Sequence, residues 1–143
     1  MTDRLSPQAR SRNMQAIKAS GMKPELIVRR VTHALGYRFR LHRHDLPGRP
    51  DLVFPSRHKI IQVYGCFWHQ HLNCPRSNVP KSRIEYWLPK LTRNADRDRR
   101  TRAALKAQGW KVLVIWECQT RDAAKLKRRI GAFLGEKADG TIK

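Results

Sequence analysis

The sequence predicts a mixed α/β fold built of layers of helices and strands. Segments with apolar residues at helical spacing alternate with short apolar runs, in the order helix, helix, three strands, helix, strand, helix. The chain has 143 residues, the usual length of one domain and enough to bury a core. We therefore expect residues 1–143 to form a single domain.

Four helices are expected, over residues 6–20, 24–35, 81–108 and 122–134. Ser6-Pro7 supplies a cap followed by proline at the first helical position, and the helix that it begins is basic. Gly36 closes the second helix, and Pro89 is a start or a kink in the third. The last helix is basic and amphipathic.

Four strands are expected, over residues 37–41, 51–54, 59–64 and 110–116. The first alternates apolar and basic residues, which is typical of a half-exposed strand. The last is the most apolar and is expected to be buried. Residues 47–50 form a turn, and residues 65–80 are irregular, with aromatic residues, histidines and two cysteines.

The net charge of +20 indicates the class of partner. Small domains stay dispersed with a net charge of only about 2–8, so this excess predicts a polyanion, with nucleic acid the leading candidate. A ribosomal or membrane-surface protein is the alternative. Four tryptophans and 40% hydrophobic residues favour a compact globular domain instead.

No segment is long enough to cross a membrane. The longest fully apolar stretch runs from Val112 to Trp116, whereas a span needs about 20 residues. The first ten residues lack the apolar core of a secretion signal. We therefore expect a cytoplasmic protein, whose three cysteines are ligands, nucleophiles or buried thiols.

One set of residues has the spacing of a zinc site: Cys66, His69, His71, Cys74 and Cys118. Tetrahedral zinc takes thiolate and imidazole ligands, often as a close pair and a distant pair. A Cys3His set would close all four positions and be structural. Spacing alone does not choose between the two histidines, and loop thiols with surface histidines are the alternative.

Asp51 leads a buried strand and is a candidate ligand for Mg²⁺. This ion prefers carboxylates together with substrate phosphate and water, and it can assist cleavage of a phosphodiester. A turn or cap residue is the alternative. Glu25 is equally ambiguous, because an acid in a first helical turn interacts favourably with the helix dipole.

Phe67 and Trp68 are adjacent large aromatics in the irregular segment. Such residues in a basic protein can insert between bases. They can equally cover a metal site or the core.

Several motifs occur together that resemble those of the very short patch repair endonucleases, the DNA mismatch nickases. They are GRPD (48–51), YGCFWH (64–69), VPKSR (79–83), NADRDRR (94–100) and GWKVLVIWEC (109–118), with RSRNM (10–14) nearer the N-terminus. The resemblance covers about residues 8–135. The combination of GCFWH with the later GW and WEC is highly specific.

The resemblance implies a PD-(D/E)XK nuclease fold and a hydrolase of DNA repair. Such an enzyme would nick one strand on the 5′ side of the thymine in a T:G mismatch, which arises when 5-methylcytosine deaminates. It implies Mg²⁺ for catalysis and one structural Zn²⁺. The zinc ligands would be Cys66, His71, Cys74 and Cys118.

The resemblance also implies roles in catalysis. Asp51 would be the main magnesium ligand, helped by the main-chain carbonyl of Val63, and Glu25 would act through water of that ion. His69 would hold or deprotonate the attacking water, and Asp98 would orient a histidine of the site.

The remaining implied residues contact DNA. Phe67 and Trp68 would wedge into the base stack beside the mismatch, together with Met14 from the N-terminal helix. Lys90 and Asn94 match positions that read base edges.

Position 64 departs from this family, whose members usually carry a second catalytic histidine there. Tyr64 offers a phenol with an ordinary pKa near ~10, a weaker proton donor that can still give a hydrogen bond to a phosphate or leaving oxygen. Gln62 stands where other nucleases of this fold place an acidic ligand, and it offers only a neutral oxygen.

The expected partner is double-stranded DNA with a mismatch, with repair proteins as further partners, and the expected state is a monomer that does not bind membranes. Two other functions remain open. One is a restriction-type or structure-specific nuclease of the same fold, and the other is a catalytically impaired mismatch-binding module, which Tyr64 permits.

Overall fold

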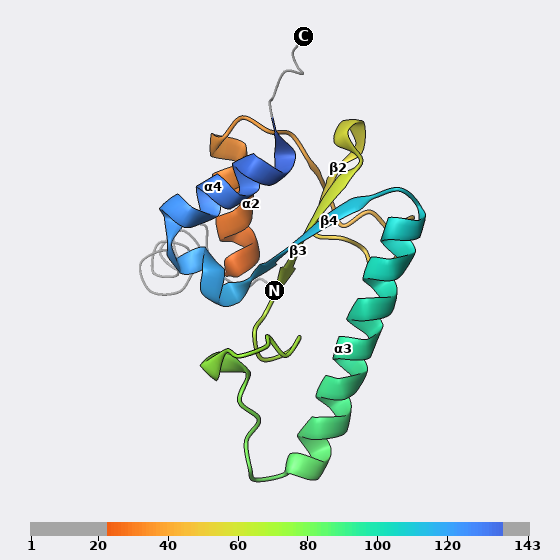
Figure 1. The fold of residues 1–143 in the computed structure, drawn as a ribbon, viewed down its shortest axis with the longest axis vertical. Helices are drawn as coiled ribbons and strands as arrows, with labels where there is room; N and C mark the ends of the chain where they lie inside the picture. Colours follow the sequence, from red (N-terminus) through yellow and green to blue (C-terminus); the bar gives the residue numbers. More distant parts are fainter. Residues whose placement is uncertain (1–22, 136–143) are drawn as a thin grey trace, which may run out of the picture.

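A computed structural model describes residues 23–135, which are built around one four-stranded sheet. Figure 1 shows the helices beside this sheet. The strand order is β1 (Arg40–Leu41), β2 (Leu52–Phe54), β3 (Lys59–Tyr64) and β4 (Lys111–Trp116). β1, β2 and β3 pair antiparallel, whereas β3 and β4 pair parallel. A parallel pair needs a long crossover, which α3 (Ile84–Ala107) supplies. The predicted mixed α/β class is confirmed.

Helices cover both faces of the sheet. Successive side chains of a strand point to opposite faces, and both faces carry apolar side chains that need a covering layer. α2 (Pro24–Ala34) and α4 (Ala123–Leu134) pack on one face, against a core that includes Phe54, Ile61 and Ile115. On the other face, Val53 and Ile60 form a smaller core with Leu105 of α3. Burial of both sheet faces explains why β2 reads as a continuous apolar run.

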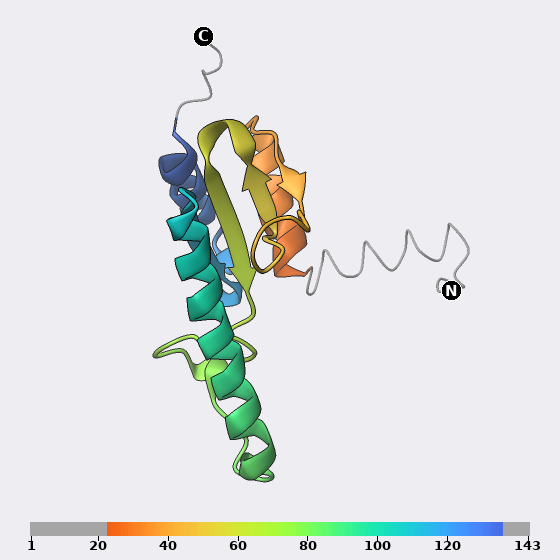
Figure 2. The same ribbon diagram turned by 90° about the vertical axis from the view of Figure 1, so that its right-hand side faces the viewer.

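α3 is much longer than the strands that it joins. Its 24 residues extend about 36 Å at 1.5 Å per residue, whereas the six residues of β4 extend about 20 Å. One half packs on the sheet, and the half that begins at Ile84 projects past the strand ends beside the irregular segment (Figures 1 and 2). Leu91, Asp98 and Leu105 are its buried residues, spaced by seven.

Most element boundaries lie within one residue of those expected from the sequence, and two differ by three residues. The strand expected over residues 37–41 is reduced to Arg40–Leu41. The helix expected from residue 81 begins at Ile84, because Arg83 adopts a left-handed conformation with φ of 61°. Asp51 precedes β2, whose first residue is Leu52.

Two further sequence predictions concern Pro89 and the helix expected over residues 6–20. Pro89 lies inside α3, where its missing N–H leaves one carbonyl of the previous turn without its helical partner. The basic helix expected over residues 6–20, with Met14, lies outside the described residues. Within residues 23–135, no helix is long and apolar enough to cross a membrane.

The turn before β2 is held against α3 at Gly48, which predicts a stability effect. Gly48 has φ of 74°, and a Cβ there would lie 2.4 Å from Cγ2 of Thr101. Gly48→Ala should therefore lose more stability than Gly109→Ala, whose φ of 92° is similar but whose Cβ would meet nothing within 4 Å. We expect overpacking to add about 1–3 kcal/mol to the loss, measured by denaturant unfolding.

A second substitution tests the cause. Thr101→Ser removes the crowding methyl group and should recover part of the stability in the Gly48→Ala background. Equal losses for the two glycine variants would mean that Thr101 moves aside without cost.

Candidate functional site

Asp51 is fixed at the end of the β2–β3 ladder. Leu52 pairs with Ile61, so the register continued by one residue places Asp51 opposite Gln62. The main-chain N–H of Val63 donates to Asp51 Oδ2 at 2.7 Å, and the Asp51 N–H donates to Gln62 Oε1 at 3.4 Å. The carboxylate therefore has one oxygen held by the strand and the other free to face the site.

Pro50 gives Val63 an unusual main-chain environment. Continued by two residues, the same register places Pro50 opposite Val63, and proline has no N–H to donate to the Val63 carbonyl. The N–H and C=O of one strand residue point to the same side, so this carbonyl faces the side on which Asp51 lies. The Val63 carbonyl and the Asp51 carboxylate therefore lie on the same side of β3, where β2 begins.

A cavity of about 210 Å³ opens beside these two groups. Its walls come from the turn before β2, the end of β3, the irregular segment and α3, and they include Asp51, Val63, Tyr64, His69 and Asp98. Burial raises the pKa of the Asp51 carboxyl above its ordinary value, and the negative charge of Glu25 adds to this rise. A site that penalises a carboxylate charge in this way favours a positive ligand.

Glu25 reaches the site through a histidine. His42 Nε2 lies 2.9 Å from Glu25 Oε2 and 3.7 Å from Asp51 Oδ1. Arg29, one turn further along α2, also pairs with Glu25 Oε2. Glu25, His42 and Asp51 form one of the clusters in the described residues that could hold a metal ion.

His69 is oriented by α3. Its Nδ1 lies 2.5 Å from Asp98 Oδ2, and Asp98 is buried because it occupies the stripe of α3 that faces the sheet. The contact leaves His69 Nε2 as the nitrogen available to a substrate or water. Tyr64 stacks on the imidazole, with ring centroids 4.1 Å apart and planes 7° from parallel, which fixes the ring plane.

Tyr64 itself is buried, and burial raises the pKa of its phenol. Arg102 Nη1 donates a hydrogen bond to the hydroxyl oxygen at 3.5 Å, and this contact partly offsets the rise in the pKa. The phenol is therefore protonated at neutral pH and can act there as a hydrogen-bond donor but not as a charged group.

The three cysteines meet beyond the ends of the parallel strands. Tyr64 pairs with Trp116, and Cys66 and Cys118 each follow two residues later. His71 Nδ1 lies 3.6 Å from Cys66 Sγ and 3.5 Å from Cys118 Sγ. These three residues and Cys74 form the second cluster that could hold a metal. Of the two histidines that the spacing left open, His71 belongs to this cluster and His69 to the cavity.

Trp116 joins the cysteine cluster to the cavity. Its indole stacks on His71 at 4.2 Å, with planes 9° from parallel, and meets the Tyr64 ring edge-on at 5.3 Å. Through Tyr64 the same row of rings continues to His69. The cysteine cluster is therefore connected to His69 of the cavity by a row of aromatic rings in contact.

The two aromatics of the irregular segment pack against the projecting half of α3. Phe67 and Trp68 meet edge to face at 5.1 Å, and Trp87 contacts both rings at 5.4 and 5.9 Å. Asn94 donates a hydrogen bond to the Trp68 carbonyl at 3.2 Å. Trp68 remains 48% exposed, so the group presents an aromatic face to the surface.

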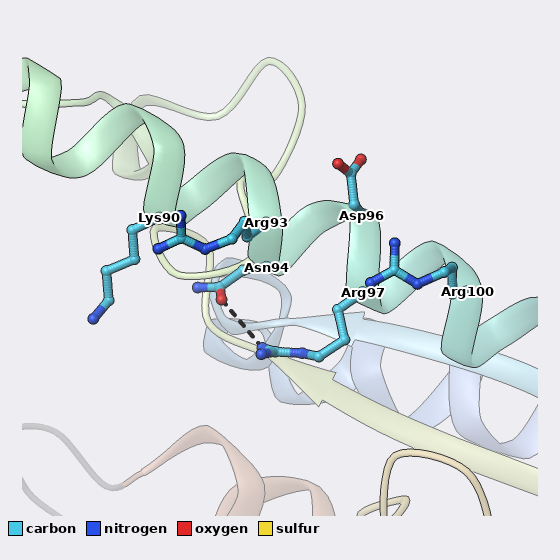
Figure 3. A pocket seen from close by; sticks show the side chains of 6 residues that line it. All are labelled: Lys90, Arg93, Asn94, Asp96, Arg97 and Arg100. Atoms are coloured by element: carbon cyan, nitrogen blue, oxygen red, sulfur yellow. Dashed lines mark hydrogen bonds between the residues drawn. The ribbon is translucent and has the colours of Figure 1, made fainter.

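Basic side chains line the outer face of α3 next to these aromatics. Figure 3 shows the hollow formed by Lys90, Arg93, Asn94, Asp96, Arg97 and Arg100. Arg97 donates to Asn94 Oδ1 at 3.2 Å, and it also lines the cavity that contains Asp51. Arg97 therefore borders both this mainly basic hollow and the cavity.

The sequence reasoning missed three residues of this region: His42, Trp87 and Arg97. Their partners are distant in sequence, and no spacing rule relates them to Asp51 or Phe67. A signal did exist for Trp87, because it lies in the helix expected over residues 81–108, which already carried two predicted DNA contacts, Lys90 and Asn94. A cavity that holds two carboxylates and a histidine, next to a basic and aromatic surface, is the arrangement expected of an endonuclease that acts on DNA.

Comparison with known proteins agrees with this class. Residues 2–76 match the family model described as DNA mismatch endonuclease Vsr. The type II nicking enzyme V.XorIIP of Xanthomonas oryzae pv. oryzae is 52% identical over 94% of this chain and 98% of its own length. The DNA mismatch endonuclease Vsr of Escherichia coli is 40% identical over 88% of this chain and 80% of its own length. The chain belongs to the DNA mismatch endonuclease Vsr family.

The raised pKa of Asp51 predicts that this carboxylate costs stability when no cation is present. A carboxyl whose folded pKa lies above its unfolded value loses its stabilising contribution as the pH rises through the folded pKa. Asp51→Asn should therefore raise the melting temperature at pH 7 in magnesium-free buffer, and the gain should shrink as the pH falls and Asp51 takes up a proton.

Adding Mg²⁺ should reverse the order of the melting temperatures of the wild type and Asp51→Asn. A Mg²⁺ ion held by Asp51 would bind the folded wild type in preference to the unfolded chain, so it would raise the wild-type melting temperature and leave that of Asp51→Asn unchanged. Differential scanning fluorimetry with and without Mg²⁺ measures both effects. If Asp51→Asn is less stable than the wild type at every pH, the charged Asp51 carboxylate does not lower the stability of the protein and this prediction is wrong.

Proposed function

We propose that this protein is a magnesium-dependent endonuclease that nicks one DNA strand on the 5′ side of the thymine in a T:G mismatch. The observation that carries the proposal is the gathering of Asp51, the Val63 carbonyl and the His69–Asp98 pair around one cavity, in a chain of this family. The sheet and its flanking helices would then be a PD-(D/E)XK nuclease fold, in which Gln62 stands in place of a second acid.

The donor set at β2 suits Mg²⁺. The free oxygen of Asp51 and the carbonyl of Val63 are hard oxygen ligands, and this ion completes its shell with water and substrate phosphate. When bound, it supplies positive charge to the scissile phosphate. Glu25 lies close enough to act on the surrounding water.

His69 is suited to hold or deprotonate the attacking water. Asp98 fixes the ring through Nδ1, so Nε2 points to the solvent of the cavity and can accept a proton. Tyr64, protonated and stacked on His69, donates a hydrogen bond to a phosphate or leaving oxygen. Because a phenol replaces the histidine usual at this position, the second proton carrier of the site is neutral.

The cysteine cluster fits one structural Zn²⁺. With Zn–S bonds of about 2.3 Å and Zn–N bonds of about 2.0–2.1 Å, tetrahedral geometry places sulfur and nitrogen about 3.6 Å apart. The two Sγ to Nδ1 distances are 3.5 and 3.6 Å. Burial raises the pKa of the Cys66 thiol, and the neighbouring thiols add to the rise, so a thiolate there needs a cation.

The surface of the projecting half of α3 would bind the mismatch. Phe67 and Trp68, supported by Trp87, would insert beside the mismatched pair, where unstacking costs least. Lys90 and Asn94 would read base edges, and the N-terminal helix with Met14 would contact the same duplex. We propose that the single domain acts as a monomer.

Nicking assays on a panel of duplexes test the proposal. Purified protein with Mg²⁺ should nick the T strand of a T:G duplex and leave the fully paired duplex intact. Asp51→Asn should lower the rate by orders of magnitude, because it removes the charge of the proposed metal ligand. DNA binding should survive, because it depends mainly on phosphate contacts and aromatic insertion.

The panel also separates the alternatives. Equal cleavage of paired and mismatched DNA would indicate a nuclease with another target. T:G binding without nicking at any Mg²⁺ concentration would indicate a mismatch-binding protein.

The zinc proposal predicts about one Zn²⁺ per chain by elemental analysis. Cys118→Ala should lose both the metal and much of the folding free energy, because binding of a structural metal is coupled to folding. Loss of zinc should also reduce nicking, since Trp116 and Tyr64 connect the cluster to His69. A stable, zinc-free wild type would contradict the proposal.

A further inference from the structure

His42 is held in a conformation that aims its imidazole at two carboxylates. It follows β1 directly and has φ of 46°, in the left-handed region that few residues other than glycine, asparagine, aspartate and histidine adopt. Its Nε2 faces Glu25 from the first turn of α2 and Asp51 from the start of β2. Three separate segments thus bring their side chains to one point.

The spacing of these atoms is that of ligands around one ion. With bonds of about 2.1 Å, adjacent ligands of an octahedral ion lie about 3 Å apart and opposite ligands about 4.2 Å apart. The distances from His42 Nε2 are 2.9 Å to Glu25 Oε2 and 3.7 Å to Asp51 Oδ1. All three ligand atoms lie within 4.8 Å of one another, so one ion can reach them.

We propose that His42 is a further ligand of the divalent cation at Asp51, so that this site prefers a transition ion such as Mn²⁺ to Mg²⁺. The proposal rests on the proposed function, which gives Asp51 a divalent cation. It adds a nitrogen ligand that neither the sequence motifs nor the family match assigns.

The ligand chemistry explains the preference. Mg²⁺ strongly favours oxygen ligands, whereas first-row transition ions accept imidazole nitrogen readily. Arg29 pairs with Glu25 and offsets its charge, so the cation depends mainly on Asp51 and His42. Tyr64 offers no imidazole at its position, and His42 is the histidine that lies against Asp51 in this cluster.

Mn²⁺ binding, followed by the loss of the free-ion EPR signal, tests the proposal without any cleavage. The variant is His42→Asn, because asparagine accepts a left-handed φ and its shorter side chain offers no nitrogen ligand. His44→Asn is the matched control, since His44 is exposed two residues further along the same loop. Mn²⁺ competes poorly for a thiolate-rich cluster, so the cysteine site does not interfere.

We expect His42→Asn to weaken Mn²⁺ binding by about tenfold or more, the range that ligand-shell changes produce. The Mg²⁺ concentration that displaces Mn²⁺ should fall by a similar factor, and His44→Asn should match the wild type. Unchanged Mn²⁺ affinity in His42→Asn would overturn the inference, as would a wild type that binds Mn²⁺ no better than Asp51→Asn.

Measuring T:G nicking on the same proteins distinguishes a failure of this inference from a failure of the proposed function. An inactive wild type that shows His42-dependent Mn²⁺ binding supports the ligand role and contradicts the nickase. An active wild type with His42-independent binding contradicts the ligand role alone.

Discussion

The parallel pairing of β3 with β4 is the constraint on which the rest of the molecule depends. Its register ends with Tyr64 beside Trp116, so the chain leaves both strands at the same edge and brings Cys66 and Cys118 together. The crossover that parallel pairing demands is α3, and this helix carries Asp98 to His69. One ladder of main-chain hydrogen bonds therefore sets both the cysteine cluster and one wall of the cavity.

The sequence predicted the architecture well where local physics decides it. Proline at the start of α2, the cap Asp122 of α4 and the apolar run of β4 define their elements without help from the rest of the chain. The sheet pairing was not predicted, because register depends on contacts between distant segments. The strand expected over residues 37–41 is short for the same reason, since only Arg40 and Leu41 find partners on β2.

The residues of the candidate site also divide into those that the local sequence indicates and those that depend on distant contacts. Motifs indicated Asp51, His69 and the cysteines because their chemistry is distinctive even in isolation. Spacing could not separate His69 from His71, and tertiary structure does so by turning one toward Asp98 and the other toward Cys66 and Cys118. His42 carried no local signal, because what distinguishes it is the pair of distant carboxylates beside it.

The row of cations on α3 means that dissolved salt acts on this molecule in two opposite directions. Lys90, Arg93, Arg97 and Arg100 are three or four residues apart on one helix face, where like charges repel by about 0.2–0.5 kcal/mol per pair. Salt screens that repulsion and therefore stabilises α3 in the protein without DNA. The same salt weakens attachment to DNA, because the duplex then gains less by releasing its own counterions. The ionic strength that best preserves the free protein is therefore higher than the one at which it holds DNA most tightly.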